Sequence, residues 1–250
     1  MALYFAYGSN VGTQGVARWC AARIQERPSW RWIGQAELPA HTLAYHYHSA
    51  ARDGGALDVV PQRGASVPGG LFEVHDFELL DVKEGAPSRY ERFECVVLDD
   101  AGAWCDATTY RVTSAHRHAR FGPPSHSYVE TVRAGCRAWG IDDSAAEAAA
   151  LGVPVRSRPN ALFVYGTLKA GFCRAPILEA YHPIRIEAAS VRGRLVDLGA
   201  YPGLVRSRDV AEDVSAVVGE LWSFAELGEL LQEVDEVEDF LGWNDVERSM

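Results

Sequence analysis

The sequence LYFAYGSN at residues 3–10 has a near-copy, LFVYGTLK, at residues 162–169. In each copy an apolar run rich in Phe, Tyr, Leu or Val ends in Tyr-Gly, followed by a small hydroxyl residue, Ser9 or Thr167. Such a run is typical of a buried strand, and a glycine directly after it is typical of a tight turn. The sequence therefore predicts two strands that end in the same kind of loop.

A second pair of similar motifs lies further along each copy. The stretch GGLFEV contains Gly70-Leu71-Phe72. We align these residues with Gly219-Glu220-Leu221 in the stretch GELWSF. The two stretches follow their Tyr-Gly loops in the same order. This order favours one fold that has been used twice.

A third pair of motifs, LLDVKEG and EVDEVED, supplies one glutamate to each copy. Glu84 lies 76 residues after Gly8, and Glu238 lies 72 residues after Gly166. A shared order at near-equal spacing indicates tandem duplication.

Length and composition are those of an ordinary globular protein. The 250 residues are 48% hydrophobic and 23% charged, which suits one large domain or two small ones, and the repeat favours two. The net charge of −10 argues against a nucleic acid or an anionic membrane surface as the main partner. A predicted strand follows Met1 closely and no apolar run reaches 18 residues, so we expect a cytoplasmic protein without signal peptide or membrane span.

Cysteine and histidine patterns do not favour a metal site. The five cysteines are odd in number and scattered, without a Cys-x-x-Cys pair, and are expected to be reduced thiols. His46 and His48 have strand spacing, whereas His116 and His118 lie in a predicted loop, and neither pair has the neighbouring acids or cysteines of a zinc site. We expect neither a metal nor another cofactor.

Local patterns predict mixed helices and strands in the first half. Tyr128, Val132 and Cys136 recur at every fourth position, as on one face of an amphipathic helix, and Gly85 is expected to end a helix. Pro39 is expected to break a strand-like region. The predicted elements are a helix in 11–24, strands in 30–49, a helix in 77–85, a hairpin of 89–100 with 104–113, and a helix in 127–140.

The repeat also predicts the domain boundaries. We expect a first domain at 1–142, a linker at 143–160 that carries a helical turn or two, and a second domain at 161–250. No counterpart of RYERFECVVL follows Glu238, so the second domain is expected to lack its last strand. Losing that strand would leave an open sheet edge and a less enclosed pocket.

These motifs resemble those of the γ-glutamylcyclotransferase superfamily. In the first half the resemblance rests on YGSN, GGALDVVP, VPGGLFEV, LLDVKEG, RYERFECVV and GPPSHSYVETVRAGCRAWG; in the second it rests on FVYGTLKAG, GRLVDLGAYPGLV and GELW, and is closest to the AIG2-like branch. It covers nearly the whole chain outside the linker. The resemblance implies an α+β fold of tandem domains, each a small mixed β-barrel with flanking helices.

The resemblance also implies the site residues. The catalytic glutamate of the family falls on Glu84 in the first copy and on Glu238 in the second. Tyr90 and Tyr128 resemble tyrosines near the family's site, although tyrosines at such positions are as often core residues. The implied substrate-binding residues of the two loops are Tyr7, Gly8, Ser9, Asn10 and Val11 in the first copy and Tyr165, Gly166, Thr167 and Leu168 in the second.

The chemistry of such a site requires little machinery. The α-amino group of a γ-glutamyl compound can close a five-membered ring on its own γ-carbonyl, expelling the amine and leaving 5-oxoproline. A carboxylate in a partly dry pocket can move the proton, because burial brings its pKa closer to the working pH, and this role fits Glu84. Backbone N–H groups of the loop Gly8–Val11 can bind the substrate's carboxylate or the forming oxyanion.

The sequence leaves the substrate and two other functions open. Glutathione, a γ-glutamyl amino acid, a γ-glutamyl-lysine crosslink and a γ-glutamyl-protected biosynthetic intermediate share the same reacting end. The alternatives to a cyclotransferase are a catalytically silent binding or scaffold protein and a γ-glutamyl transferase or hydrolase that uses an external acceptor.

Overall fold

The described part of the chain has two separate hydrophobic cores. The computed structural model describes residues 1–23, 30–153, 160–199, 202–205, 215–238 and 240. These residues divide into a first unit within 1–153 and a second unit within 160–240. None of the described helices is long and apolar enough to cross a lipid bilayer.

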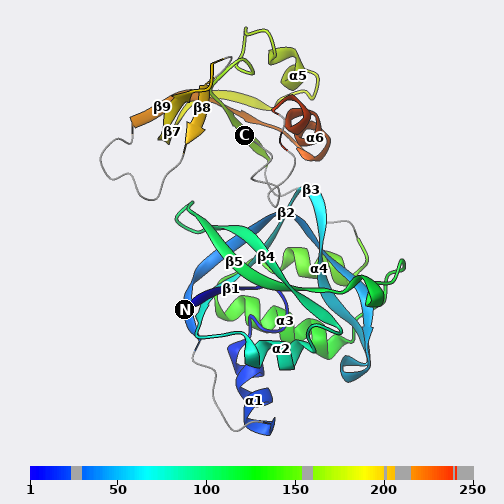
Figure 1. Ribbon diagram of the computed structural model, residues 1–250. Helices are drawn as coiled ribbons and strands as arrows, with labels where there is room; N and C mark the ends of the chain where they lie inside the picture. The colour runs from blue at the N-terminus through cyan, green and yellow to red at the C-terminus, as the bar shows by residue number, and fades with distance from the viewer. Residues whose placement is uncertain (24–29, 154–159, 200–201, 206–214, 239, 241–250) are drawn as a thin grey trace. The chain divides into compact units, whose positions relative to one another are not determined.

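The first unit is a closed five-stranded barrel (Figure 1). Neighbouring strands pair antiparallel, except that β1 and β5 meet in a parallel pairing of Tyr4 with Thr108 that closes the barrel. The strands, in barrel order, are β1 (Ala2–Ala6), β3 (Gly54–Val74), β2 (Arg31–Ser49), β4 (Tyr90–Asp99) and β5 (Trp104–Val112).

Four helices accompany this barrel, and they follow the sequence patterns closely. The helix α2 ends at Gly85, whose φ of 69° suits a glycine, and α3 buries Tyr128, Val132 and Cys136 along one face. Of two short 3₁₀ turns, Ala50–Arg52 joins β2 to β3, and Ser114–His116 lies between β5 and α3. The helices are α1 (Thr13–Arg23), α2 (Glu78–Glu84), α3 (His126–Ala138) and α4 (Ser144–Ala150).

The strand β2 does not break at Pro39, so that prediction was wrong. The pairing of β2 with β3 shifts register between Pro39 and His41, and Ala40 has a φ of 54°. This is a β-bulge, which accommodates the proline and continues the strand on its far side.

The helix α4 occupies residues that the sequence assigned to the linker. Its Ala145, Ala146 and Ala149 are buried in the core of the first unit. Their small side chains allow close packing, so the first unit includes α4. The part of the expected linker at 154–159 lies outside the described residues.

The described residues of the second unit form a four-stranded sheet that does not close into a barrel. Its core includes Val164, Leu178, Trp222 and Leu230. The strands, in sheet order, are β6 (Ala161–Val164), β9 (Ser215–Ser223), β7 (Arg185–Asp197) and β8 (Pro202–Val205), and the helices are α5 (Ala175–Glu179) and α6 (Gly228–Val237).

Strand pairing shows how the two units correspond. The order β6-β9-β7 repeats the order β1-β3-β2, and the described residues of the second unit contain no counterpart of β4 and β5. Ala6 pairs with Gly70, and the equivalent Val164 pairs with Glu220. Glu220 therefore corresponds to Gly70, and the match of Gly219 with Gly70 was wrong by one residue.

The corrected register explains a glycine shared by both units. A Cβ atom on Gly69 would lie 2.5 Å from the carbonyl oxygen of Ala6, and one on Gly219 would lie 2.3 Å from that of Val164. Both distances are too short for any residue other than glycine at this crossing. Both units thus have a glycine where the first strand, β1 or β6, lies closest to its neighbour, β3 or β9.

Candidate active site

The carboxylate of Glu84 lies at the C-terminal end of α2 and is held by two polar neighbours. Its Oε1 accepts a hydrogen bond from Asn10 Nδ2 at 2.8 Å and lies 3.4 Å from Lys83 Nζ. Lys83 also donates to Asn10 Oδ1, and the Asn10 amide donates to the Tyr4 hydroxyl at 2.8 Å. Only 17% of the Glu84 side chain is exposed, so the carboxylate is largely shielded from solvent and fixed in position.

The loop after β1 forms a tight turn beside this carboxylate. Val11 N donates to Gly8 O at 3.0 Å, so the N–H group of Val11 is used within the turn. The N–H groups of Ser9 and Asn10 have no acceptor among the described residues. These two donors are therefore available to an anionic ligand.

Two adjoining hollows, called here the deep part and the wider part of one cavity, lie between this loop and Glu84 and share part of their lining. The deep part, about 30 Å³, lies against the loop, and the wider part, about 330 Å³, shares with it Ser9, Glu84, Tyr90 and Tyr128. Glu84 therefore stands where the two parts meet. The deep part is lined by Tyr4, Tyr7, Gly8, Ser9, Asn10, Leu57, Glu84, Tyr90, Tyr110 and Tyr128.

The tyrosines around the deep part remain protonated. Burial raises the pKa of Tyr4, Tyr7 and Tyr90 well above the usual value, and the negative charge of Glu84 raises the pKa of each further. Burial also raises the pKa of Tyr128, against the lowering effect of Arg52. The walls of the deep part are thus neutral phenols, and Glu84 is the only carboxylic acid among the described residues that line it.

The backbone of Leu57 aligns two of these tyrosines. Tyr90 OH donates to Leu57 O at 3.0 Å, and Leu57 N donates to Tyr128 OH at 3.4 Å. Tyr7 OH donates to Tyr110 O at 2.6 Å. These phenols therefore have fixed orientations in the lining of the deep part.

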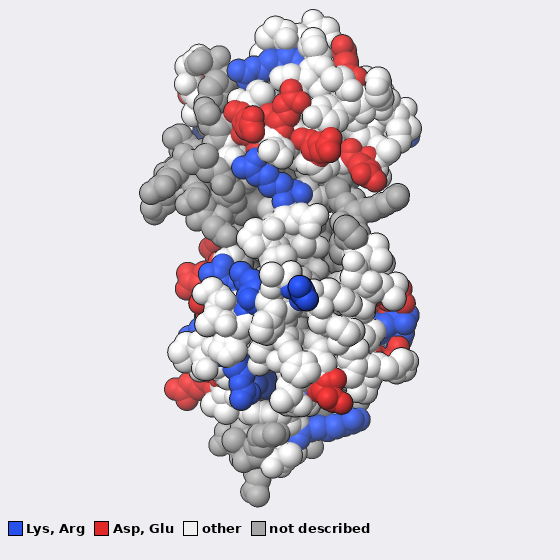
Figure 2. All heavy atoms as spheres, turned by 90° about the vertical axis from the view of Figure 1, so that its right-hand side faces the viewer, with Lys and Arg blue, Asp and Glu red and all other residues white. Residues whose placement is uncertain are grey.

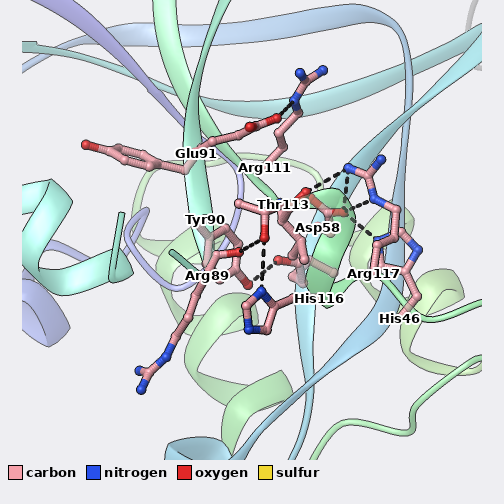
Figure 3. A network of polar contacts seen from close by, with 12 residues as sticks. His46, Asp58, Arg89, Tyr90, Glu91, Arg111, Thr113, His116 and Arg117 are labelled. Carbon is pink, nitrogen blue, oxygen red and sulfur yellow. Dashed lines mark hydrogen bonds and ion pairs between the residues drawn. The ribbon is translucent and has the colours of Figure 1, made fainter. Parts of the chain in front are cut away.

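The residue after Leu57, Asp58, is a fully buried carboxylate (Figure 3). Its Oδ1 accepts from Val112 N at 2.7 Å, and its Oδ2 lies 2.5 Å from His46 Nε2 and 3.3 Å from Arg117 Nε. Several donors therefore offset the cost of burying the charge. We define the set Asp58, His46 and Arg117 as the Asp58 cluster, which fixes the chain next to Leu57.

Two of the four histidines considered as metal ligands have other side-chain partners. His46 contacts Asp58, and His116 Nδ1 lies 3.0 Å from Thr113 Oγ1. Within the described ranges no group of three or more His, Cys, Asp or Glu side chains is arranged to hold a metal ion.

The second unit places its own Tyr-Gly loop beside a cavity of about 490 Å³. Lys169 N donates to Gly166 O at 3.2 Å, which repeats the turn of the first loop. Tyr165 OH accepts from Leu204 N at 3.1 Å and lies 3.3 Å from Pro202 O. The lining includes Leu162, Phe163, Val164, Tyr165, Gly166, Thr167, Leu168, Lys169, Phe172, Arg174, Pro202, Val234, Val237 and Glu238.

Glu238 is held less firmly than Glu84. Its side chain is 47% exposed, and its ion pair is a 3.8 Å contact with Arg174, which is equally exposed. Leu168 takes the place of Asn10 in the loop, and Val237 precedes Glu238 as Lys83 precedes Glu84. Neither apolar side chain can bind a carboxylate, so the two anchors of Glu84 are replaced.

The helix that precedes Glu238 is also longer than the helix that ends in Glu84. The helix α6 has 10 residues and α2 has 7, a difference of about one turn. Counted from Gly69 and Gly219, Glu84 corresponds to Val234, which is buried in the second core with Leu168. Counted from the helix ends, Glu84 corresponds to Val237, and Glu238 is the residue that directly follows α6.

The structure brings most of the residues expected for the first site around one cavity. Tyr7, Gly8, Ser9, Asn10, Glu84, Tyr90 and Tyr128 line it, whereas Val11 is buried outside the lining. Sequence reasoning missed Tyr4, Leu57, Lys83 and Tyr110. Lys83 is adjacent to Glu84, but a lysine on a short helix is usually solvated, so nothing in the sequence distinguished it.

Several solved structures are similar to this chain. An uncharacterized protein from Homo sapiens is 25% identical, with 56% of this chain and 80% of that chain covered and a TM-score of 0.48. A chain described as gamma-glutamyl cyclotransferase has the same identity and coverage with a TM-score of 0.47. YkqA from Bacillus subtilis is 22% identical, with 55% of this chain and 49% of that chain covered and a TM-score of 0.46.

Curated proteins give no match to this sequence. A protein-family description, "Gamma-glutamyl cyclotransferase, AIG2-like", matches two segments, residues 4–130 and 162–248. The two segments coincide with the two halves of the repeat and together span most of the chain. The chain therefore belongs to the gamma-glutamyl cyclotransferase, AIG2-like family, with one matching segment in each half.

Proposed function

We propose that the first unit is a γ-glutamylcyclotransferase in which Glu84 is the general acid and base. The observation that carries this proposal is the position of the Glu84 carboxylate at the junction of the two cavity parts, held by Asn10 and Lys83. Family membership supports a cyclotransferase-type function in general terms. The substrate is a small γ-glutamyl compound, and the products are 5-oxoproline and a free amine.

The proposed reaction is a ring closure within the substrate. The α-amino nitrogen attacks the γ-carbonyl carbon, and Glu84 takes the proton that this nitrogen releases. The bond from the γ-carbon to the leaving nitrogen then breaks, and Glu84 returns the proton to that nitrogen. The enzyme is regenerated without an external nucleophile or electron donor, and holding the substrate folded supplies several kcal/mol of the rate enhancement.

Each neighbour of Glu84 has a defined role in this scheme. Asn10 and Lys83 both contact Oε1, so Oε2 is the oxygen that exchanges the proton; it has no hydrogen-bond partner among the described residues. The N–H groups of Ser9 and Asn10 bind an anionic oxygen of the substrate. The neutral tyrosines exclude water without competing for the proton.

The second unit is proposed to contribute little turnover. The greater exposure of Glu238 and the replacement of both anchors support this assignment. The unit retains a larger and more apolar cavity, which is consistent with ligand binding without catalysis. A catalytically silent binding role therefore remains the alternative for this half.

The test is a search for 5-oxoproline. The full-length chain is incubated with a panel of γ-glutamyl compounds, and the products are identified by mass spectrometry. Wild-type protein is expected to release 5-oxoproline, and Glu84→Gln is expected to lower the rate about 100-fold or more, because Gln keeps the shape but cannot transfer a proton. Glu78→Gln is the matched control, since Glu78 is an exposed residue of the same helix.

Two outcomes of this assay would replace the proposal. Glutamate or a glutamyl adduct in place of 5-oxoproline would indicate a hydrolase or a transferase. A Glu84→Gln variant with near-full turnover would remove this residue from the mechanism.

A further inference from the structure

The wider part of the first unit's cavity carries an excess of positive charge. Arg52, Lys83 and Arg89 line it, and Glu84 is the one carboxylate among the described residues of its lining. This is the reverse of the chain as a whole, whose net charge is −10. Acidic side chains gather instead on surfaces such as that of the second unit (Figure 2), where α6 alone carries Glu229, Glu233, Asp235 and Glu236.

Two of these three cations have partners within the site. Lys83 contacts Glu84 and Asn10. Arg52 Nη2 donates to Ser9 Oγ at 3.0 Å, and its guanidinium carbon lies 4.7 Å from the centre of the Tyr128 ring. Arg52 therefore supports the loop and the tyrosine wall, and no carboxylate of the described residues forms an ion pair with it.

Arg89 combines a fixed backbone with a free guanidinium. Its N–H donates to Gly85 O at 2.9 Å, and its carbonyl accepts from Thr113 N at 3.0 Å and from Thr113 Oγ1 at 3.2 Å. Figure 3 shows its side chain extending away from these contacts, and no dashed line reaches the guanidinium. Within the described part of the chain, this guanidinium has neither an ion pair nor a hydrogen bond.

The two parts of the cavity suit the two halves of a γ-glutamyl compound. The deep part has room only for a small group beside the loop. The wider part lies on the other side of Glu84, where the leaving amine must emerge if Glu84 protonates it. An unpaired arginine in that part attracts an anion, and its planar fork matches a carboxylate or a phosphate.

We propose that the first unit selects γ-glutamyl compounds whose amine half carries an anionic group, a carboxylate or a phosphate, bound by Arg89 with Arg52 behind it. This inference rests on the proposed function of the same site. It assigns Arg89 the role of a specificity residue and gives it no part in proton transfer.

Four substrates with one common γ-glutamyl end test the proposal on the full-length chain. The amine halves are glycine, with a carboxylate, O-phosphoethanolamine, with a phosphate, glycinamide, which is neutral, and ethylenediamine, which is cationic. The kcat/KM of the anionic pair is expected to exceed that of the neutral compound about fivefold, the effect of one partly exposed ion pair, and the cationic compound is expected to be the poorest. The better of the anionic pair identifies the natural group.

Variants then assign this preference to one residue. Arg89→Ala is expected to bring the anionic-to-neutral ratio close to one, and Arg89→Glu is expected to invert it. Arg120→Ala is the matched control, because Arg120 is exposed and does not line the cavity, and it should keep the wild-type ratio. A wild-type ratio near one, or an Arg89→Ala variant that keeps the wild-type ratio, would overturn the inference.

A binding measurement separates this inference from the proposed reaction. Calorimetric titration of Glu84→Gln with the same compounds should show the same preference without turnover. If the wild-type protein cyclises none of them and the preference is present, the proposed reaction fails and the selection of anions stands. If Glu84→Gln binds the anionic and neutral compounds equally, the selection of anions is refuted whatever the turnover.

Discussion

The two units begin with the same kind of strand and loop, but their glutamates differ in exposure and in the residues that contact them. In the first unit Glu84 is 17% exposed and anchored by Asn10 and Lys83, beside a closed barrel. In the second unit Glu238 is 47% exposed, and Leu168 and Val237 take the places of the anchors, beside an open sheet. The comparison indicates that the loop and the helix supply a position for a carboxylate, whereas the side chains around it determine whether that position is rigid and shielded.

The largest expected effect concerns the Asp58 cluster, which belongs to the first unit alone. Asp58→Asn removes the buried charge that His46 and Arg117 contact, and breaking such a pair costs about 3–5 kcal/mol of unfolding free energy. Urea unfolding of the full-length chain should show one unit destabilised and the other unchanged. The control Asp106→Asn, at an exposed position of β5, should leave both transitions in place.

The next effect concerns the anchor of Glu84. Asn10→Leu gives the first loop the residue of the second and removes a hydrogen bond to a charged group, worth about 1.5–3 kcal/mol. We expect a fall in kcat/KM of about tenfold or more. If Asn10→Leu turns over as fast as wild type, anchoring does not explain the difference between the units.

Raising the pH is also expected to act on the first unit. Tyr4, Tyr7 and Tyr90 have a raised pKa in the folded protein because they are buried, so the folded state holds their protons more tightly than the unfolded state does. Their contribution to stability is complete below pH 10 and declines above it, by up to about 1.4 kcal/mol per pH unit for each tyrosine. Circular dichroism between pH 9 and pH 12 should show that the first unit unfolds before the second; simultaneous loss of both would contradict this.

The smallest expected effect is that of metal removal. In the proposed mechanism the nucleophile belongs to the substrate and Glu84 moves the proton, so treatment with a chelator should leave the rate unchanged in both the wild-type protein and Glu238→Gln. A loss of activity that zinc restores would direct attention back to His46, His48, His116 and His118.

The sequence predicted the elements whose signals are local. The end of α2 at Gly85, the hairpin of β4 with β5 and the buried face of α3 all follow from short patterns. The bulge at Ala40 could not be predicted. A proline usually ends a strand, and only the pairing with β3 shows that a shift in register lets β2 continue past Pro39.

Contacts between residues far apart in the sequence could not be predicted without the folded structure. The contact of Asn10 with Glu84 joins residues 74 positions apart, and no local pattern encodes it. The sequence aligned Gly219 with Gly70 because the second copy has one glycine where the first has the pair Gly69-Gly70. Only the strand pairing of Ala6 and of Val164 shows that Gly219 corresponds to Gly69. Whether a carboxylate pairs with the Arg89 guanidinium likewise depends on which acidic side chains the fold brings near it.

The most direct test of the account compares the two glutamates in one assay. Glu84→Gln, Glu238→Gln and the double variant are made in the full-length chain, and the initial rate of 5-oxoproline release is measured with the best γ-glutamyl substrate. The account predicts that Glu84→Gln and the double variant lose about 100-fold or more and that Glu238→Gln stays within about twofold of wild type. Activity that survives in Glu84→Gln and disappears in Glu238→Gln would contradict the account and place the working site in the second unit.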